Sequence, residues 1–363
     1  MSTTGWQVVE VAPGEDPDGW AHRGLERVSR AVTVERDGHD DVAWRAIDSA
    51  TDLAHQEDEE RTLLLAVDDA VVDGSPESVL GWVRVDRQTT ANQHAAWVHV
   101  EVHPGHRGRG VGSALLARGE QVAARAGRGT LQGEASFAEV VDGPQLPAPT
   151  GSGKAPARAP GVRFALAHGY ELVQVDRRST LATPVPPQRL DALEADAVPH
   201  ADDYRLHAWH GELPEQWLDA FALLETRMST DAPMGKLDFR EDVWDAERVR
   251  RSHTALAESG HDFVITAAEH VATRELAAMT MLTWHRDPDA YAFQWDTIVL
   301  KPHRGRRLGM LVKSANLRRL AELRPGTLRV HTWNAEENDH MLAINVALGF
   351  RPAGGAAMFQ KRP

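Results

Sequence analysis

The chain of 363 residues is 42% hydrophobic and 26% charged, as expected for a globular protein with room for two domains. Because cysteine is absent, disulfides, thiolate metal sites and a cysteine nucleophile are excluded. The formal net charge of −13 disfavours nucleic acid as a partner, and it either attracts a cationic molecule or serves solubility alone.

The first half of the chain shows a strand, a helix and three more strands ahead of a glycine-rich turn. Residues 142–161, rich in proline, glycine and alanine, cannot build a core, so we expect a surface loop there. Apolar runs and alternation predict strands at 6–11, 61–67, 79–85 and 96–102, and helices at 17–30 and 113–126.

The second half repeats this order of elements. A proline-rich stretch, Thr183–Pro187, predicts a linker at 186–200 between an N-terminal domain (1–185) and a C-terminal domain (201–363). Helices around a mostly antiparallel, mixed sheet make each half an α+β domain. In the second half, strands are predicted at 204–209, 263–268, 276–284 and 291–300, and helices at 214–228, 241–259 and 310–323.

A turn rich in glycine and arginine occurs twice. Residues 106–112 (His-Arg-Gly-Arg-Gly-Val-Gly) are similar to residues 303–309 (His-Arg-Gly-Arg-Arg-Leu-Gly), and both follow a strand and open a helix. The first amides of a helix have no internal partner, and the helix dipole adds partial positive charge, so a pyrophosphate suits this position. Glycine lets the backbone approach phosphate, while Arg107 and Arg109 add charge.

The first of these turns resembles the acetyl-CoA pyrophosphate motif of the GNAT acetyltransferases. With the repeat, the resemblance covers nearly the whole chain and is to the bacterial tandem GNAT proteins, which include mycothiol synthase. It implies acetyl-CoA as cofactor, held by the strand ends, the turns and the helix starts. The residues implied are Val100, Glu101, Val102, Arg107, Gly108, Arg109, Gly110, Val111, Gly112 and Ser113 in the first half, and Ile298, Val299, Leu300, Arg304, Gly305, Arg306, Arg307, Leu308, Gly309, Asn334 and Asn338 in the second.

The second copy departs from the motif at one position. Arg307 stands where the first motif glycine is expected, so its side chain either crowds the phosphate or swings outward and adds charge. Against this, the segment from Trp333 to Phe350 is similar to the C-terminal segment of the family, including an asparagine at the end of a strand.

The resemblance also implies a catalytic base on the strand before the turn. In the family this base lies four or six residues before the end of the strand, which gives Asp296 and Gln294 in the second half but Val98 and Ala96 in the first. Asp296 is therefore the candidate base, directly or through water, with a structural carboxylate as the alternative. His99 and Glu101 have the opposite parity and are expected on the other side of the sheet.

The tyrosine that often protonates the leaving thiolate in the family is missing. Its slot holds Ala165 in the first half and Asn345 in the second, which leaves water or another group such as His340. Asp231, between two predicted helices, is either a site for a cationic acceptor or a turn residue. Four tryptophans of the second half either line a pocket or belong to the core: Trp244, Trp284, Trp295 and Trp333.

Together these observations predict an N-acetyltransferase that transfers acetyl to a primary amine of a small molecule or peptide. The chemistry is expected in the C-terminal domain, and the alternatives are a non-catalytic acyl-CoA sensor or mycothiol synthase. The histidines lack the spacing of metal ligands, so no metal is expected. The sequence shows neither a bilayer-spanning apolar run nor a secretory signal, so we expect a cytoplasmic protein.

Overall fold

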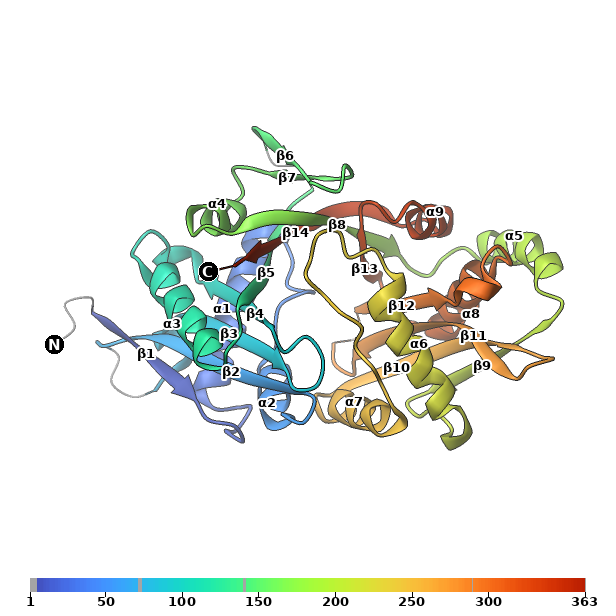
Figure 1. Cartoon of the computed structure of the whole chain (residues 1–363), viewed down its shortest axis with the longest axis horizontal. Helices are drawn as coiled ribbons and strands as arrows, with labels where there is room; N and C mark the ends of the chain where they lie inside the picture. The colour runs from blue at the N-terminus through green and yellow to red at the C-terminus, as the bar shows by residue number, and fades with distance from the viewer. Residues whose placement is uncertain (1–4, 71–73, 140–141, 289, 363) are drawn as a thin grey trace. The chain divides into compact units, whose positions relative to one another are not determined.

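A computed structural model describes residues 5–70, 74–139, 142–288 and 290–362 (Figure 1). The chain divides into two compact units. The N-terminal unit comprises Met1–Pro144, Pro156–Val173 and Ala357–Pro363, and the C-terminal unit comprises Gln145–Ala155 and Gln174–Ala356. Strand β8 (Glu171–Ala182) thus falls mainly in the C-terminal unit, and the end of β14 (Arg351–Lys361) falls in the N-terminal unit.

The sheet of the N-terminal unit is antiparallel from its first strand to its fourth, and the fifth strand joins in parallel. Helix α1 packs on one face through Leu25 and Val28, which meet Trp82 in the core. Helix α3 lies on the other face, where Gly119 approaches Val83. The elements are β1 (Trp6–Val11), α1 (Trp20–Asp37), α2 (Ala46–Ala54), β2 (Glu59–Asp68), β3 (Val79–Gln88), β4 (Ala95–Val102), α3 (Val111–Arg125), β5 (Thr130–Phe137) and α4 (Pro160–Ala167).

The sheet of the C-terminal unit repeats this plan. Four strands pair antiparallel in chain order, the next joins in parallel, and β8 pairs antiparallel with it. The elements are α5 (Pro187–Ala197), β9 (Tyr204–His210), α6 (Leu218–Asp231), α7 (Ala246–Glu258), β10 (His261–His270), β11 (Glu275–His285), β12 (Tyr291–Val299), α8 (Leu308–Leu323), β13 (Arg329–Ala335) and α9 (Asp339–Leu348). Both halves therefore have the expected α+β architecture.

Three segments are more ordered than the sequence suggested. The predicted linker at 186–200 forms α5, which starts with Pro187 in its first turn and buries Leu190 and Ala197. The predicted loop at 142–161 contains the short strands β6 (Gln145–Pro147) and β7 (Lys154–Pro156) and the start of α4, and it buries several alanines. The short helix α2 was not predicted at all.

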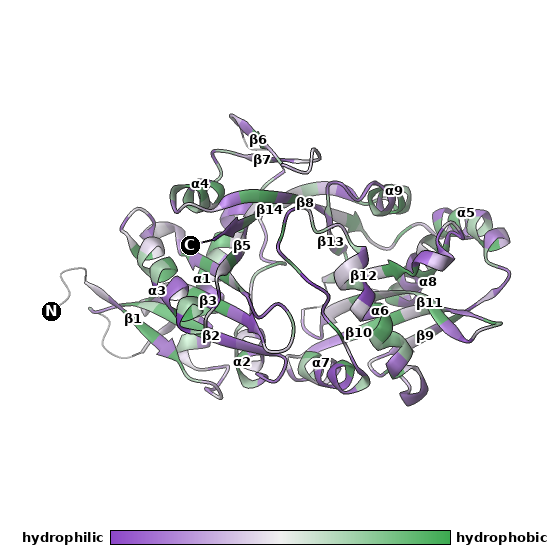
Figure 2. Cartoon of the chain, viewed as in Figure 1, coloured by the Kyte–Doolittle hydropathy of each residue, from purple (hydrophilic) through white to green (hydrophobic). Residues whose placement is uncertain are grey.

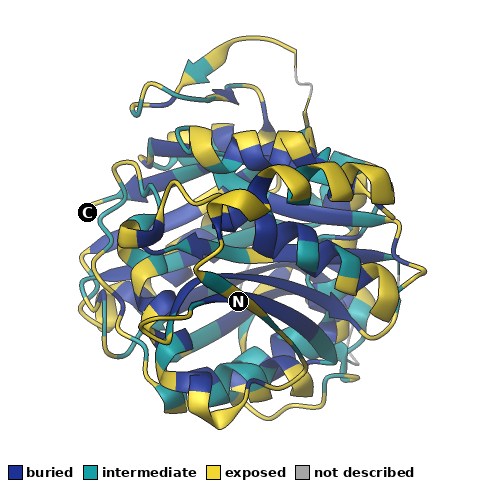
Figure 3. Cartoon of the chain, turned by 90° about the vertical axis from the view of Figure 1, so that its right-hand side faces the viewer, coloured by how far each residue is buried: buried dark blue, intermediate teal, exposed yellow. Residues whose placement is uncertain are grey.

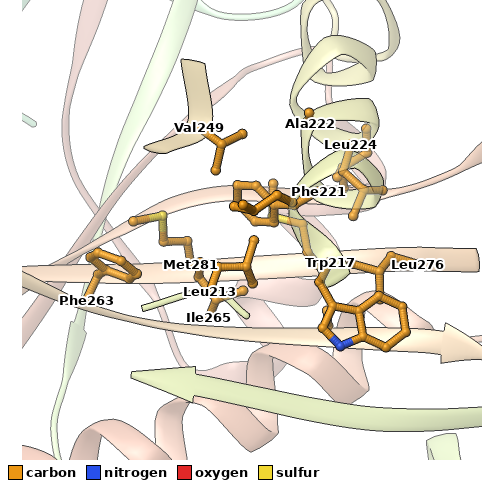
Figure 4. Packing of buried hydrophobic residues seen from close by; sticks show 14 of the residues in the cluster. Leu213, Trp217, Phe221, Ala222, Leu224, Val249, Phe263, Ile265, Leu276 and Met281 are labelled. Atoms are coloured by element: carbon orange, nitrogen blue, oxygen red, sulfur yellow. The ribbon is translucent and has the colours of Figure 1, made fainter. Parts of the chain in front are cut away.

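The core of the C-terminal unit lies between the sheet and helices α6 and α7. Figure 4 shows Phe221 of α6 packed among residues from α7 and the strands, including Val249 and Met281. Hydrophobic stretches fall mainly on the strands and on one side of the helices (Figure 2), and the strands are largely buried (Figure 3). The helices are therefore held by their apolar faces rather than by helix propensity alone.

Truncation of Phe221 should test this core. The side chain is 2% exposed, so Phe221→Ala is expected to lower the free energy of unfolding by about 3–5 kcal/mol. Urea unfolding followed by tryptophan fluorescence would measure the loss. Leu223 on the same helix is 40% exposed, so Leu223→Ala is a matched control, and a similar loss in both variants would contradict the packing described.

Acid should destabilise the same core through His253. Its ring packs against Phe263, and burial lowers its pKa to about 4. Below the ordinary histidine pKa of about 6.5 the unfolded chain therefore binds a proton at this residue, whereas the folded chain binds it only near pH 4. The free energy of unfolding thus falls by about 1.4 kcal/mol per pH unit as the pH drops across that window. Chemical unfolding at pH 7 and pH 5 should show a smaller fall for His253→Gln than for the native chain.

Candidate functional site

The two glycine-rich turns have the same backbone path. In the N-terminal unit Gly108 and Gly110 have φ of +74° and +83°, and in the C-terminal unit Gly305 and Arg307 have φ of +81° and +55°. Helix α3 begins after the first turn and α8 after the second, and neither helix has a side-chain hydrogen bond at its N-cap. The amides of each first turn are thus left for an outside anion, which is the chemistry that a diphosphate needs.

Arg307 keeps this path without a glycine. Its backbone is left-handed, which costs about 1–2 kcal/mol for a residue with a side chain. The guanidinium forms an ion pair with Asp196 of α5. Of the two orientations that the sequence left open for the Arg307 side chain, the structure therefore shows the outward one.

The first arginine of each turn binds the end of the preceding strand and a helix of the same unit. Arg107 donates from Nε to the Val102 carbonyl (3.3 Å) and pairs with Glu35 of α1 (2.5 Å). Arg304 donates in the same way to the Val299 carbonyl (3.1 Å) and pairs with Asp231 of α6 (3.0 Å). Each arginine thus connects the end of the strand before its turn, β4 or β12, to a helix on the other face of the sheet from the helix that follows the turn.

Asp231 therefore has a different environment from the one expected of an acceptor site. Its carboxylate also pairs with the Lys301 amine at 2.8 Å, so two cations of its own chain already occupy it. A third cation from outside would have to displace one of them. The structure thus favours a role in holding the turn.

Both units open their sheet beside the turn. Parallel pairing of β4 with β5 covers Ala95–Trp97, and that of β12 with β13 covers Tyr291–Phe293. Beyond these residues the two parallel strands separate, so the facing edge of the first strand presents unpaired backbone groups. The predicted binding residues on these strands lie along this edge: Val100, Glu101 and Val102 in β4, and Ile298, Val299 and then Leu300 after β12.

Strand β12 differs from β4 by a bulge. Thr280 of β11 lies opposite Thr297, but Leu282 lies opposite Gln294, so Trp295 and Asp296 together face a single residue. The pairing of β3 with β4 is regular from Gly81 to Asp86. A bulge redirects side chains, and here it coincides with the predicted base.

Because of the bulge, the side chains of Asp296 and Gln294 point to opposite faces of the sheet. Ile298 belongs to the core formed with α6 and α7, so Asp296, two residues earlier, points to that face. The Gln294 amide instead donates to Thr280 Oγ1 (2.9 Å) and to the Met281 carbonyl (2.7 Å), inside the sheet and toward α8. The expectation that both side chains share one face is therefore corrected by the extra residue.

Asp296 lies beside a second carboxyl group, that of Glu225 on α6. Burial raises the pKa of Asp296 to about 6, and burial together with the charge of Asp296 raises the pKa of Glu225 well above its usual range. Arg248 of α7 acts in the opposite direction on Glu225. The pair thus holds a proton more tightly than exposed carboxylates would, and Asp296 is poised to accept one.

Glu225 was missed by sequence reasoning, although a signal was present. It lies four residues after Phe221 and seven after Leu218, on the apolar stripe that α6 buries. Burying a carboxylate in the apolar stripe of a helix costs free energy, so its presence there indicates a function. The same helix therefore supplies both the core and the second acid of the site.

The comparison of the two strands also corrects the reading of His99. When Arg107 is aligned with Arg304, Val102 corresponds to Val299 and His99 to Asp296. His99 stacks on Trp82 with ring centroids 4.9 Å apart, and Trp82 belongs to the core under α1. His99 thus occupies the position and face of Asp296, because Val102 corresponds to Val299 and not to Leu300 as the sequence suggested.

The remaining predicted residues have mainly local partners. Asn338 caps α9 by accepting from the Met341 amide (3.2 Å), and Asn334 accepts from the Asn345 amide (2.7 Å). Ser113 contacts His168 (3.0 Å). His340 is exposed, as expected. Of the four tryptophans, Trp284 is fully buried, whereas Trp295 is 44% exposed beside Asp296. Arg109 contacts His106 at 3.1 Å.

Comparison with known proteins agrees with this architecture. The acetyltransferase (GNAT) family matches residues 29–134, from the middle of α1 to β5. A solved tandem GNAT protein from the clavulanic acid biosynthesis pathway is 25% identical, with a TM-score of 0.73 over 98% of each chain. The N-terminal half of the chain thus matches the GNAT family, and the chain as a whole has the fold of a tandem GNAT protein. It is accordingly an acyltransferase with two α+β GNAT domains, as the repeated turn predicted.

More distant structures share the fold of this tandem GNAT protein. A GCN5-related N-acetyltransferase from Sphaerobacter thermophilus is 15% identical, with a TM-score of 0.59 over 98% of this chain and 96% of that one. A putative acetyltransferase from Pyrococcus horikoshii is 12% identical, with a TM-score of 0.56 over 100% and 91%. No curated protein sequence matches the chain. Within the described residues, every helix is too short or too polar to cross a bilayer.

Proposed function

We propose that the C-terminal unit transfers an acetyl group from acetyl-CoA to a primary amine by direct attack, with Asp296 as the base. The observation that carries this proposal is the close pair of half-buried Asp296 and buried Glu225 at the bulge of β12, next to the open edge and the glycine-rich turn. A base with a pKa of about 6 is ionised at neutral pH yet still basic enough to take a proton from an ammonium.

The chain fits the coenzyme at three places. The uncapped start of α8 and the positive φ of Gly305 suit a diphosphate, and the edge of β12 beyond Phe293 suits an extended amide chain. Bound there, acetyl-CoA would supply the activated thioester. A backbone N–H on this edge would then polarise the thioester carbonyl, while Asp296 removes the proton of the acceptor.

For the N-terminal unit we propose binding of acetyl-CoA without transfer. Its turn has both glycines, but its acceptor face is filled by its own side chains. Arg84 is buried against Trp44 (4.1 Å to the ring) and pairs with Asp52 (2.7 Å) and Asp86 (2.8 Å). His99, at the position of the base, is stacked flat on a core tryptophan.

Thiol release from acetyl-CoA tests the function directly. The native chain, assayed with a panel of small amines and peptides, is expected to release coenzyme A only when an acceptor is present, and mass spectrometry should detect the acetylated amine. Acetyl-CoA that binds but is consumed with no amine of the panel would favour the sensor, the alternative that Arg307 and the missing tyrosine support. The acidic pair predicts that cationic amines are the better acceptors.

A further inference from the structure

Lys313 of α8 is a buried cation that the proposed reaction has not used. It is 1% exposed, and among the described residues its amine has no carboxylate partner. The nearest recorded partner is the ring of Phe350, whose centroid is 5.6 Å from Nζ. Burying an ammonium without an anion is costly, so such a group calls for an explanation.

The position of Lys313 follows from the helix that carries it. Helix α8 connects β12 to the parallel strand β13, so it runs back along β12 from the turn. A Cβ on Gly309 would lie 3.1 Å from Ile344 of α9 and 3.8 Å from Val299 of β12. This face of α8 therefore looks toward both elements.

Lys313 lies on that same face, one turn further along. A helical turn advances about 6 Å, which equals about two residues of a strand. Starting from Val299, this brings Lys313 to the level of Thr297, next to Asp296. Asp296 points to the face of α6 and α7, on which Ile298 packs, so the backbone positions that carry Lys313 and Asp296 lie at about one level on opposite faces of the sheet.

Other buried polar atoms around this edge also lack partners. Among the described residues, no hydrogen bond reaches Gln294 Oε1 on β12 or Asn345 Oδ1 on α9. Gln294 and Asn345 are each less than 5% exposed. Unpaired polar atoms on the two elements that flank the opening, β12 and α9, indicate a polar ligand there.

We propose that Lys313 is the proton donor to the leaving sulfur, in place of the tyrosine that this chain lacks. The proposal rests on acetyl transfer by the C-terminal unit. The amine nitrogen forms the new C–N bond as the C–S bond breaks and leaves its electron pair on sulfur. Asp296 takes one proton from the attacking nitrogen, Lys313 gives one to sulfur, and both residues return to their starting states by exchange with solvent.

The basicity of Lys313 agrees with this task. Burial lowers its pKa to about 7, close to the pH at which it would have to donate. A donor matched to the working pH gives up its proton readily and regains it readily. An ordinary exposed lysine would hold its proton too tightly.

The first test uses bound coenzyme A and needs no turnover. The thiolate absorbs in the ultraviolet, so the pKa of the bound thiol can be titrated for the native protein, for Lys313→Met, and for Lys154→Met as a control at an exposed lysine. The native protein and the control should show an acid constant at least tenfold higher than Lys313→Met. An equal pKa in all three, or a native value no lower than that of free coenzyme A, would overturn the proposal.

The second test uses turnover. Lys313→Met should lower kcat by about 10²-fold with KM for acetyl-CoA little changed, since the loss concerns the leaving group. If the native protein transfers acetyl and Lys313→Met keeps its kcat, Lys313 is structural and the proposed function stands. If the native protein acetylates no amine, the proposed function fails, and the thiol titration still decides on Lys313. Lys313→Gln repeats both tests if the methionine variant does not fold.

Discussion

Asp296→Asn should lower kcat for acetyl transfer by about 10²- to 10⁴-fold while leaving the affinity for acetyl-CoA nearly unchanged. The amide keeps the size and the hydrogen-bonding capacity of the side chain but cannot take a proton. In the native chain kcat should fall as the pH drops through about 6, where Asp296 takes up its proton, and this acid limb should be lost in the variant. Stopped-flow or steady-state thiol release between pH 5 and 9 would measure both effects.

Two comparisons make this test specific. Asp202→Asn changes an exposed aspartate ahead of β9 and should behave like the native chain. Glu225→Gln imitates the protonated form that burial favours at Glu225, so it should keep most of the activity at pH 7.5. Arg248, the cation that faces this pair from α7, is left in place in all variants. Full activity in Asp296→Asn would contradict the assignment of the base.

Gly305→Asp should weaken binding of coenzyme A to the C-terminal unit by about 10- to 100-fold, whereas Gly305→Asn should weaken it far less. The two side chains have the same size, and both residue types tolerate a φ of +81° better than most. A Cβ at Gly305 meets nothing within 4 Å, so neither variant should disturb the fold. Only the aspartate places a negative charge beside the diphosphate, at a cost of about 1–3 kcal/mol.

The same pair of substitutions at Gly108 tests the N-terminal unit, where φ is +74° and the space around the Cβ is equally open. Isothermal titration calorimetry should find two sites on the native chain. Each aspartate variant should weaken one site and leave the other intact, which assigns the sites to the units. Equal affinities for Gly305→Asp and Gly305→Asn would mean that the turn does not face the diphosphate.

The fold and the repeated turn were predictable because their signals are local. Alternating apolar residues and short apolar runs gave nearly every strand, and the spacing of glycine and arginine gave both turns. The helix α5 was missed because Pro186 and Pro187 read as a linker, although proline at the start of a helix is common and Leu190 supplies an apolar contact. Proline alone therefore does not separate a linker from a helix start.

The details of the site were less predictable because they depend on pairing between strands. An extra residue in β12 changes no composition and no motif, yet it decides that Asp296 and Gln294 face opposite ways. The role expected for Asp231 failed for a similar reason, since its partners Lys301 and Arg304 are distant in sequence. Glu225 is the exception, because its place on the apolar stripe of α6 was visible in the sequence.

Helix α6 carries both Glu225, beside the proposed base Asp296, and Asp231, which forms an ion pair with Arg304 of the turn. Six residues of helix separate them by about 9 Å, and a helix of this length moves as a stiff rod. A tilt that made room for an incoming amine at one end would pull on the turn at the other. If the proposed site is right, we expect binding of the acceptor to change the affinity for the donor through this helix, without any contact between the two substrates.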